Sequence, residues 1–339
     1  TFESEPDVTM SILASVASIQ KNKQTLFKYE EVSSTFNDFK ALRNLGVIPP
    51  KTINPAQFRK MDDFSKLVAV TTAQALTESN LNLKKVDTSK IGILFTTPSG
   101  PVEVVEGIEK QITTEGYAHV SASRFPFTVM NAAAGMLSII FKINGPLSVL
   151  ATNSGTLDGI QYAQEMMRND NLDYILLVSA HQWTDMSLMW WQQMGYDSQS
   201  YIGADYCSAQ VLSRHGERNY LQVLGSKQLK YSGKSIDDIS TIFDVALQDL
   251  LLELNMTMKD INGLVWNESK KIKSLDYDFL CKLPEKFQLP NLGHGQFSFS
   301  SNGAGEELDY IVNSSIDAGH YLLLSYSKFG GISFAIVKK

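Results

Sequence analysis

Thr152 stands where an α/β enzyme would present a nucleophile. It follows a strand-like run, residues 145–151 (GPLSVLA), and precedes Asn153-Ser154-Gly155, which opens a helix-like segment. A side chain at such a strand-to-helix turn is placed to attack an acyl carbon. A threonine hydroxyl, however, is a weak nucleophile at neutral pH unless a nearby base accepts its proton. The first question is therefore whether this turn carries chemistry at all.

Other motifs that would carry chemistry are missing. Ser154 lacks the Gly-x-Ser-x-Gly pattern of a hydrolase, and Gly92 and Gly100 lack the spacing of a phosphate-binding loop. The histidines lack the close spacing of metal ligands. They are His119, His181, His215, His294 and His320. We expect no metal and no cofactor.

Alternating strand-like and helix-like segments would position the turn, as in layered α/β folds with mostly parallel strands. In residues 1–218 the pattern predicts strand 8–18, helix 58–81, strand 91–95, helices 102–112 and 132–141, strand 145–151, helix 155–168 and strand 174–178. In residues 219–339 it predicts strand 220–224, a helix over 236–254 capped by Ser235, strand 261–266, a helix within 306–312 and a hairpin of 321–326 with 332–337. Small and apolar residues on every face predict that helix 132–141 is buried. The repeated order of elements divides the chain into two halves, 1–218 and 219–339.

Composition limits the class of protein. The chain has 339 residues, 43% of them hydrophobic and 19% charged, with a net charge of −6, which predicts a large core and no nucleic-acid partner. The apolar run 8–19 is too short to span a bilayer and no basic segment precedes it, so we expect neither a membrane partner nor a signal peptide. Two cysteines, Cys207 and Cys281, suit packing in a reducing compartment, and a cytoplasmic location is expected.

Residues 145–180 (GPLSVLATNSGTLDGIQYAQEMMRNDNLDYILLVSA) resemble the β-ketoacyl synthases. In that family the same place reads Gly-Pro, a short strand, Thr-Ala-Cys-x-Ser-Gly and a helix. Aligning Ala151 and Ser154-Gly155 with this motif puts Thr152 at the position of the nucleophilic cysteine. Residues 126–135 (PFTVMNAAAG) resemble the segment that precedes the nucleophile strand. The resemblance covers most of the chain and is strongest over 125–180.

The family also uses two histidines, and the resemblance puts neither in this chain. Asn267 follows the strand 261–266 at the place of the first histidine, without the Gly-Thr-Gly-Thr that follows it in the family. Anchoring on residues 302–305 (NGAG) puts Phe299 at the second. Neither side chain accepts a proton, although Asn267 could donate an oxyanion hydrogen bond. Phe329-Gly330-Gly331 matches the second half of the family's Gly-Phe-Gly-Gly gate loop.

The resemblance therefore implies a condensing enzyme that has lost its catalytic residues. It implies a thiolase-like, five-layered αβαβα fold, and the role of a chain length factor, or ketosynthase β subunit, in a heterodimer with a catalytic ketosynthase. Acyl carrier protein would be met through that complex. A strand would pair with the partner's equivalent strand, and three bulky side chains would end the partner's acyl tunnel. The strand residues are Ser148, Val149, Leu150 and Ala151; the tunnel residues are Phe125, Phe127 and Met130.

Two alternatives stay open. One is a divergent acyltransferase or thioesterase that uses Thr152, with Asn267 as a helper. Such an enzyme needs a base within reach of Thr152, and no histidine falls in a matching motif. The other is an acyl-binding homodimer that needs no ketosynthase.

Overall fold

The structure is a computed structural model that describes residues 10–21, 53–152, 155–182, 184, 204–214, 221–231, 235–266, 279–293, 306–327 and 331–339. Its strands form one nine-stranded sheet in the order β3-β2-β4-β5-β1-β6-β9-β8-β7. The strands are β1 (Met10–Lys21), β2 (Ile91–Thr97), β3 (Leu147–Ala151), β4 (Tyr174–His181), β5 (Ala204–Ser213), β6 (Leu221–Lys230), β7 (Ile261–Trp266), β8 (His320–Ser327) and β9 (Gly331–Lys338).

The sheet consists of two parts joined by a short seam. The first part holds the parallel strands β3, β2 and β4 and the antiparallel strands β5 and β1. The second holds β6, β9 and β8, which pair antiparallel, and β7, which is parallel to β8. Only the start of β1, from Met10 to Ile12, pairs with β6. The two parts can therefore fold back toward each other across a shared layer of helices.

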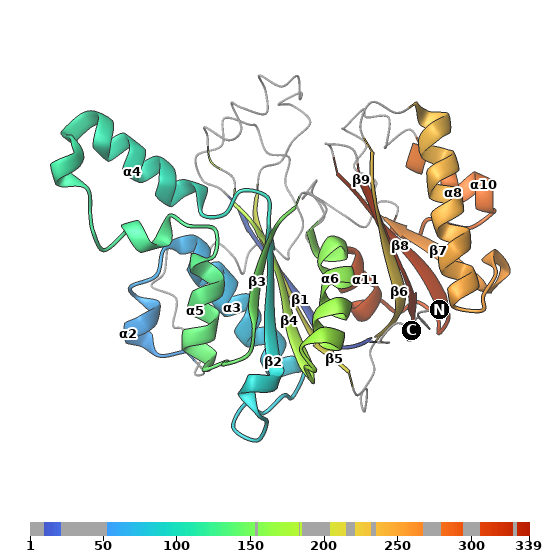
Figure 1. The fold of residues 1–339 in the computed structure, drawn as a ribbon, viewed down its shortest axis with the longest axis horizontal. Helices are drawn as coiled ribbons and strands as arrows, with labels where there is room; N and C mark the ends of the chain where they lie inside the picture. Colours follow the sequence, from blue (N-terminus) through green and yellow to red (C-terminus); the bar gives the residue numbers. More distant parts are fainter. Residues whose placement is uncertain are drawn as a thin grey trace.

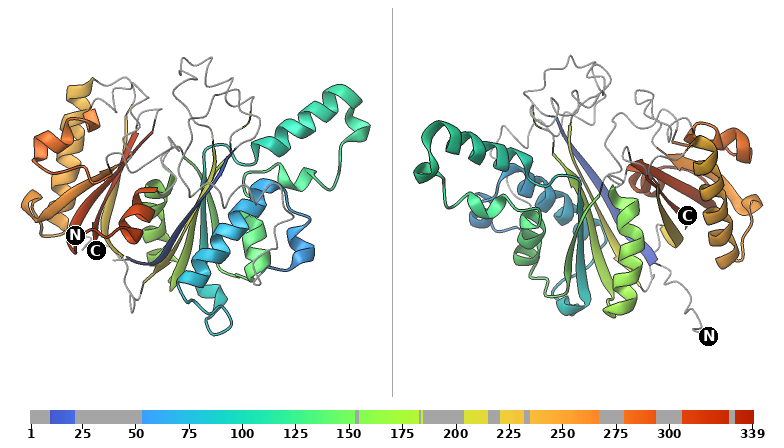
Figure 2. Two further views of the ribbon diagram at one scale, coloured as in Figure 1. Left: turned by 180° about the vertical axis from the view of Figure 1, so that it is seen from behind. Right: turned by 45° about the horizontal axis from the view of Figure 1, so that its top comes forward.

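Helices complete five layers (Figures 1 and 2). On one outer face lie α3 and α5, between the two parts of the sheet lie α6 and α11, and on the other outer face lie α8 and α10. The helices are α2 (Pro55–Phe58), α3 (Asp63–Glu78), α4 (Val102–Glu115), α5 (Ala132–Phe141), α6 (Gly155–Asn169), α8 (Ile236–Glu253), α10 (Leu283–Phe287) and α11 (Glu306–Asn313). Three apolar cores fill the spaces between the layers. The predicted α/β fold class and its five layers are confirmed.

Local sequence explains α8 best. Ser235 accepts from the amide of Asp238, whose carboxylate accepts in return, so the predicted cap is a capping box. The apolar stripe then buries Ile239, Phe243 and Leu247 against β6, β8 and β9.

Two expectations differ from the structure. Strand β5 was not expected, because its sequence, ADYCSAQVLS, contains polar residues that break an apolar run. Ser208 and Gln210 are nevertheless buried there, at 0% and 1% exposure. Helix α5 is not buried on every side, since Ile139 is 58% exposed. Among the described helices, none has both the length and the apolarity needed to cross a bilayer.

Candidate functional site

Thr152 lies directly after β3, at the carboxyl end of the parallel strands. Its amide donates to the carbonyl oxygen of Thr97 in β2, with an N···O distance of 3.2 Å. The chain approaches β2 closely because Gly145 precedes β3, and a Cβ at that position would lie 2.1 Å from the carbonyl oxygen of Ile91. The backbone of the turn is thus held against the neighbouring strand.

The side chain of Thr152 is held by a carboxylate. Its hydroxyl donates to Oδ2 of Asp158, and Oδ1 of Asp158 accepts from the hydroxyl of Ser333 in β9. Asp158 lies in the first turn of α6 and is 8% exposed. A negative charge is favourable at that end of a helix. One buried carboxylate therefore connects the turn after β3 to a strand from the second half of the chain.

Asp158 was not predicted as a site residue, because the resemblance points to histidines as the partners of the nucleophile. A signal was present, because an acidic residue six positions after Thr152 falls in the first turn of the helix that the turn opens.

A buried cluster of hydroxyl groups surrounds the start of α6. Thr156 donates to Oγ of Ser179 at 2.7 Å and lies 3.2 Å from Oγ of Ser208, and Ser179 also bonds Thr96. All four residues are at most 2% exposed. They satisfy one another as buried polar groups must, and hydroxyl groups are not bases at neutral pH.

The cysteine side chains offer no replacement nucleophile at this turn. Burial raises the pKa of Cys207 to about 12, and a hydrogen bond involving Thr71 only partly opposes the shift. A thiol with that pKa stays protonated and unreactive at neutral pH. Cys281 is exposed and lies next to α10, in the second half of the chain.

Several predicted site residues lie outside the described part of the chain: Asn267, Phe299, Phe329 and Gly330. Gly331 is described. It is the first residue of β9, is buried, and stands two positions before Ser333. The end of the predicted gate loop is thereby brought to the strand that bonds Asp158.

The predicted interface strand lies at the edge of the sheet. Ser148, Val149, Leu150 and Ala151 all belong to β3, and within the described residues β3 pairs with β2 alone. Ser148, Val149 and Leu150 are half-buried and Ala151 is exposed.

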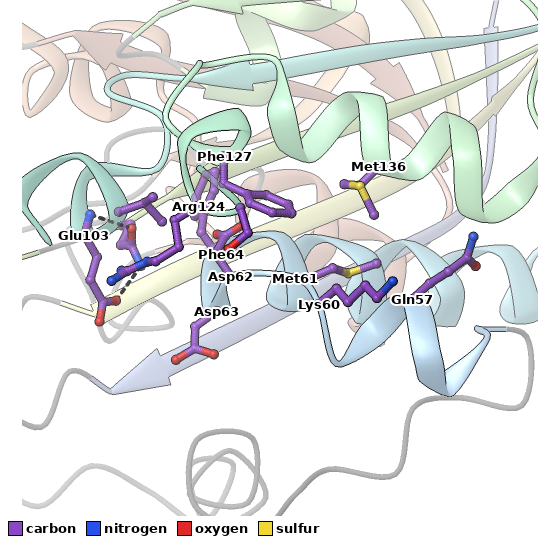
Figure 3. Close-up of a pocket in the computed structure, with 13 residues that line it drawn as sticks. Gln57, Lys60, Met61, Asp62, Asp63, Phe64, Glu103, Arg124, Phe127 and Met136 are labelled. Atoms are coloured by element: carbon purple, nitrogen blue, oxygen red, sulfur yellow. Dashed lines mark hydrogen bonds between the residues drawn. The ribbon is translucent and has the colours of Figure 1, made fainter. Parts of the chain in front are cut away.

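A pocket of about 760 Å³ opens between the start of α3, the start of α4, the 3₁₀ turn η4 (Phe125–Phe127) and α5 (Figure 3). Its apolar lining comes from Met61, Phe64, Val104, Phe127 and Met136. Its polar lining comes from Gln57, Lys60, Asp62, Asp63, Glu103, Ser123, Arg124 and Gln182. At one end Glu103 and Gln182 bond twice, the Glu103 amide to Oε1 at 3.1 Å and Nε2 to the Glu103 carboxylate at 3.0 Å.

The three predicted tunnel residues occupy different environments. Phe127 lines this pocket. Phe125 does not, and it is 61% exposed on the surface. Met130 packs beside Gly100, where a Cβ would lie 3.2 Å from its Cγ. A second pocket of about 1030 Å³, between α3 and the end of α5, contains none of the three.

No metal centre is evident in the part of the chain that the structure describes, since no three histidine, cysteine or acidic side chains gather as ligands there.

Comparison with known proteins links this fold to one family. Residues 50–209 match the family model described as β-ketoacyl synthase, N-terminal domain. The 3-oxoacyl-[acyl-carrier-protein] synthase 2 of Vibrio cholerae is 30% identical over 116 residues, which are 34% of this chain and 28% of that protein. The match therefore spans less than a third of that relative.

Two solved structures match nearly the whole chain in fold. The ishigamide ketosynthase/chain length factor has a TM-score of 0.74 at 15% identity and covers 97% of this chain and 99% of its own. A type II ketosynthase in complex with its acyl-carrier protein, AntDE:AntF, has a TM-score of 0.71 at 14% identity, with coverages of 98% and 99%. These likenesses show a thiolase-like fold.

Proposed function

We propose that this chain is a non-catalytic subunit of a ketosynthase, because residues 50–209 match the model of the β-ketoacyl synthase N-terminal domain and the whole chain has the fold of the ketosynthases. It pairs with a catalytic ketosynthase, as a chain length factor, and helps to shape and limit the acyl tunnel of that enzyme. The observation that carries the proposal is the turn at Thr152, where a hydroxyl is bonded to a carboxylate. The resemblance gives this position to the thiol of the family.

The chemical requirements of condensation argue against catalytic activity in this chain. A covalent acyl intermediate needs a strong nucleophile and groups that stabilise the oxyanion. Thr152 supplies a weak one, and Asn267 and Phe299, at the histidine positions of the resemblance, cannot exchange protons. The hydroxyl groups around α6 add no base.

The surface near β3 supports a partner. The strand has an unpaired edge within the described residues, and large apolar side chains are exposed on the segments that follow one another from α4 to α5. They are Val105, Tyr117, Phe125, Val129 and Ile139. Helix α4, which carries Val105, projects from the body of the molecule (Figures 1 and 2). An extended edge strand is suited to pairing with another chain, and the exposed Ile139 on α5, a helix that contacts β3, is compatible with an interface there.

The names of the structural neighbours agree with such a partnership. One is a ketosynthase/chain length factor and the other a ketosynthase bound to its acyl-carrier protein. By analogy, acyl carrier protein reaches this chain through the complex with the catalytic subunit.

Intact-mass spectrometry tests the absence of catalysis. The purified chain is incubated with an acyl-carrier-protein thioester, and the expected mass of the chain is unchanged. An added acyl group that disappears in Thr152→Val would refute a non-catalytic function.

Co-expression with a catalytic ketosynthase tests the partnership. A stable homodimer that does not bind the ketosynthase would favour the acyl-binding alternative.

One observation favours a second function. The Thr152 hydroxyl bonds a carboxylate, and a nucleophile beside an oriented base is the arrangement of an acyl-transfer enzyme. In that function Asp158 takes the hydroxyl proton and Oγ1 of Thr152 attacks the thioester carbon. The C–O ester bond forms as the C–S bond breaks, and the carrier leaves as a thiol that receives the proton from Asp158. The same mass measurement separates the two functions, because this one requires an adduct that Asp158→Asn abolishes.

A further inference from the structure

Asp158 is a buried carboxylate in the middle layer of the fold (Figure 1). It is 8% exposed, and both of its carboxylate oxygens accept from hydroxyl groups, those of Thr152 and Ser333. Carboxylates are rarely buried unless they are compensated by hydrogen bonds or opposite charge. Its place therefore needs a reason beyond packing.

The carboxylate lies within one hydrogen bond of the side chain at position 152. It also occupies the first turn of α6, where the helix dipole would otherwise favour an anionic nucleophile. A negative charge already present there removes that advantage.

We propose that Asp158 keeps the turn at position 152 closed to any anionic nucleophile, by binding the side chain there as a hydrogen-bond donor and by supplying the local negative charge itself. This inference rests on the proposed non-catalytic function and deepens it. The loss of the cysteine is then not reversible by one substitution, because a restored thiol would meet a carboxylate instead of an open helix end.

Electrostatics gives the expected size of the effect. A like charge within hydrogen-bond distance disfavours ionisation, and shifts of about one to three pKa units are typical for charges this close. Each unit changes the thiolate fraction about tenfold at a pH below the pKa. Replacing Asp158 by a neutral side chain should therefore lower the pKa of a thiol at position 152 and raise its reactivity.

The test measures alkylation by iodoacetamide between pH 6 and 10, with the site located by mass spectrometry. All variants carry Cys281→Ser, because that thiol is exposed. Thr152→Cys alone should react slowly at pH 7, and Thr152→Cys/Asp158→Asn at least about tenfold faster, with a pH profile moved to lower pH. Equal rates and equal pH profiles in the two variants would overturn the proposal.

Ser333→Ala distinguishes an effect of the Asp158 charge from an effect of a loosened turn at position 152. Combined with Thr152→Cys, it removes one hydrogen bond to Asp158 but keeps the carboxylate, so the reaction should stay slow. An acceleration equal to that of Asp158→Asn would mean that the turn had only loosened, which contradicts the proposal. Thr152→Cys/Asp158→Ser repeats the neutral substitution with a smaller side chain and should also be fast.

Cys207 serves as an internal control for folding. It is fully buried with a raised pKa, so it should remain unmodified in every folded variant. Rates are taken from molecules in which Cys207 is unmodified. The mass test with the unsubstituted chain stays separate: an acyl group on Thr152 would refute the non-catalytic function, whereas equal alkylation rates refute only the role of Asp158.

Discussion

The contact between Thr152 and Asp158 fits either an enzyme or a turn that Asp158 keeps closed to a nucleophile. The low proton affinity of a carboxylate favours the closed turn. A carboxylic acid in a peptide has a pKa near 3.9, so its carboxylate is a poor acceptor for the proton of an alcohol. A histidine would have been a better base. A non-catalytic function is therefore favoured over an acyl-transfer enzyme.

Phe127 is the residue at which we expect acyl chain length to be set. It lines the pocket of about 760 Å³ beside Met61, Phe64 and Met136, so Phe127→Ala should enlarge that apolar space (Figure 3). The complex with the catalytic subunit should then make products longer by one or more extension units, as read by mass spectrometry. Phe125→Ala removes the same atoms outside the pocket and is the matched control, read only from complexes that gel filtration shows to be intact, because Phe125 belongs to the exposed apolar side chains proposed to face the partner. Longer products from Phe125→Ala alone would place the end of the tunnel at the surface instead.

The sequence located the turn but not its chemistry. Thr152 could be identified because its neighbours follow a linear motif. Asp158 and Ser333 could not be paired in advance, since 175 positions separate them and only the packing of β9 against α6 brings them together. Asn267 and Phe299 remain predictions.

At the scale of elements, α6 must pack closely against the sheet for its first turn to reach Thr152. Gly159 permits this, because a Cβ there would lie 2.5 Å from Cδ1 of the buried Leu177. Gly159→Ala should therefore cost about 1–3 kcal/mol of unfolding free energy. Gly135→Ala in α5 is the matched control, since a Cβ there meets nothing within 4 Å. It should be neutral or stabilise by up to about 1 kcal/mol. Urea unfolding of the single chain checks both, and a loss of stability of similar size in the two variants would contradict the close packing of α6.

Elements with a strong hydrophobic periodicity could be predicted from the sequence, whereas a buried strand that contains polar residues could not. The stripe of α8 and its capping residue Ser235 are local signals, and both appear in the structure. β5 is paired on both sides, with β4 and β1, and Ser208 is buried against Thr156 of α6 regardless of its polarity. No local pattern announces such a strand.

At the scale of the whole molecule, α6 ties the two parts of the sheet together through polar contacts. Besides Asp158 and Ser333, Oγ of Ser226 in β6 donates to Oε1 of Gln164 in α6 at 2.9 Å. Helix α5 lies on the other side of the first part of the sheet, away from these contacts (Figure 1). Loss of a partner from α5 would therefore leave the contacts of α6 with β6 and β9 undisturbed.

This separation allows the interface to be tested by charge. Ile139 in α5 is 58% exposed in the single chain, so Ile139→Asp should leave folding intact. Within an interface the new carboxylate would lose water without gaining a partner, at a cost of several kcal/mol, and co-purification with the catalytic ketosynthase should fall at least about tenfold. Leu252→Asp is the control, because Leu252 is 77% exposed on α8 at the opposite outer face. Binding that survives Ile139→Asp but fails with Leu252→Asp would move the partner to α8. A self-associated chain that Ile139→Asp converts to monomers would instead identify the second copy of this chain as the partner.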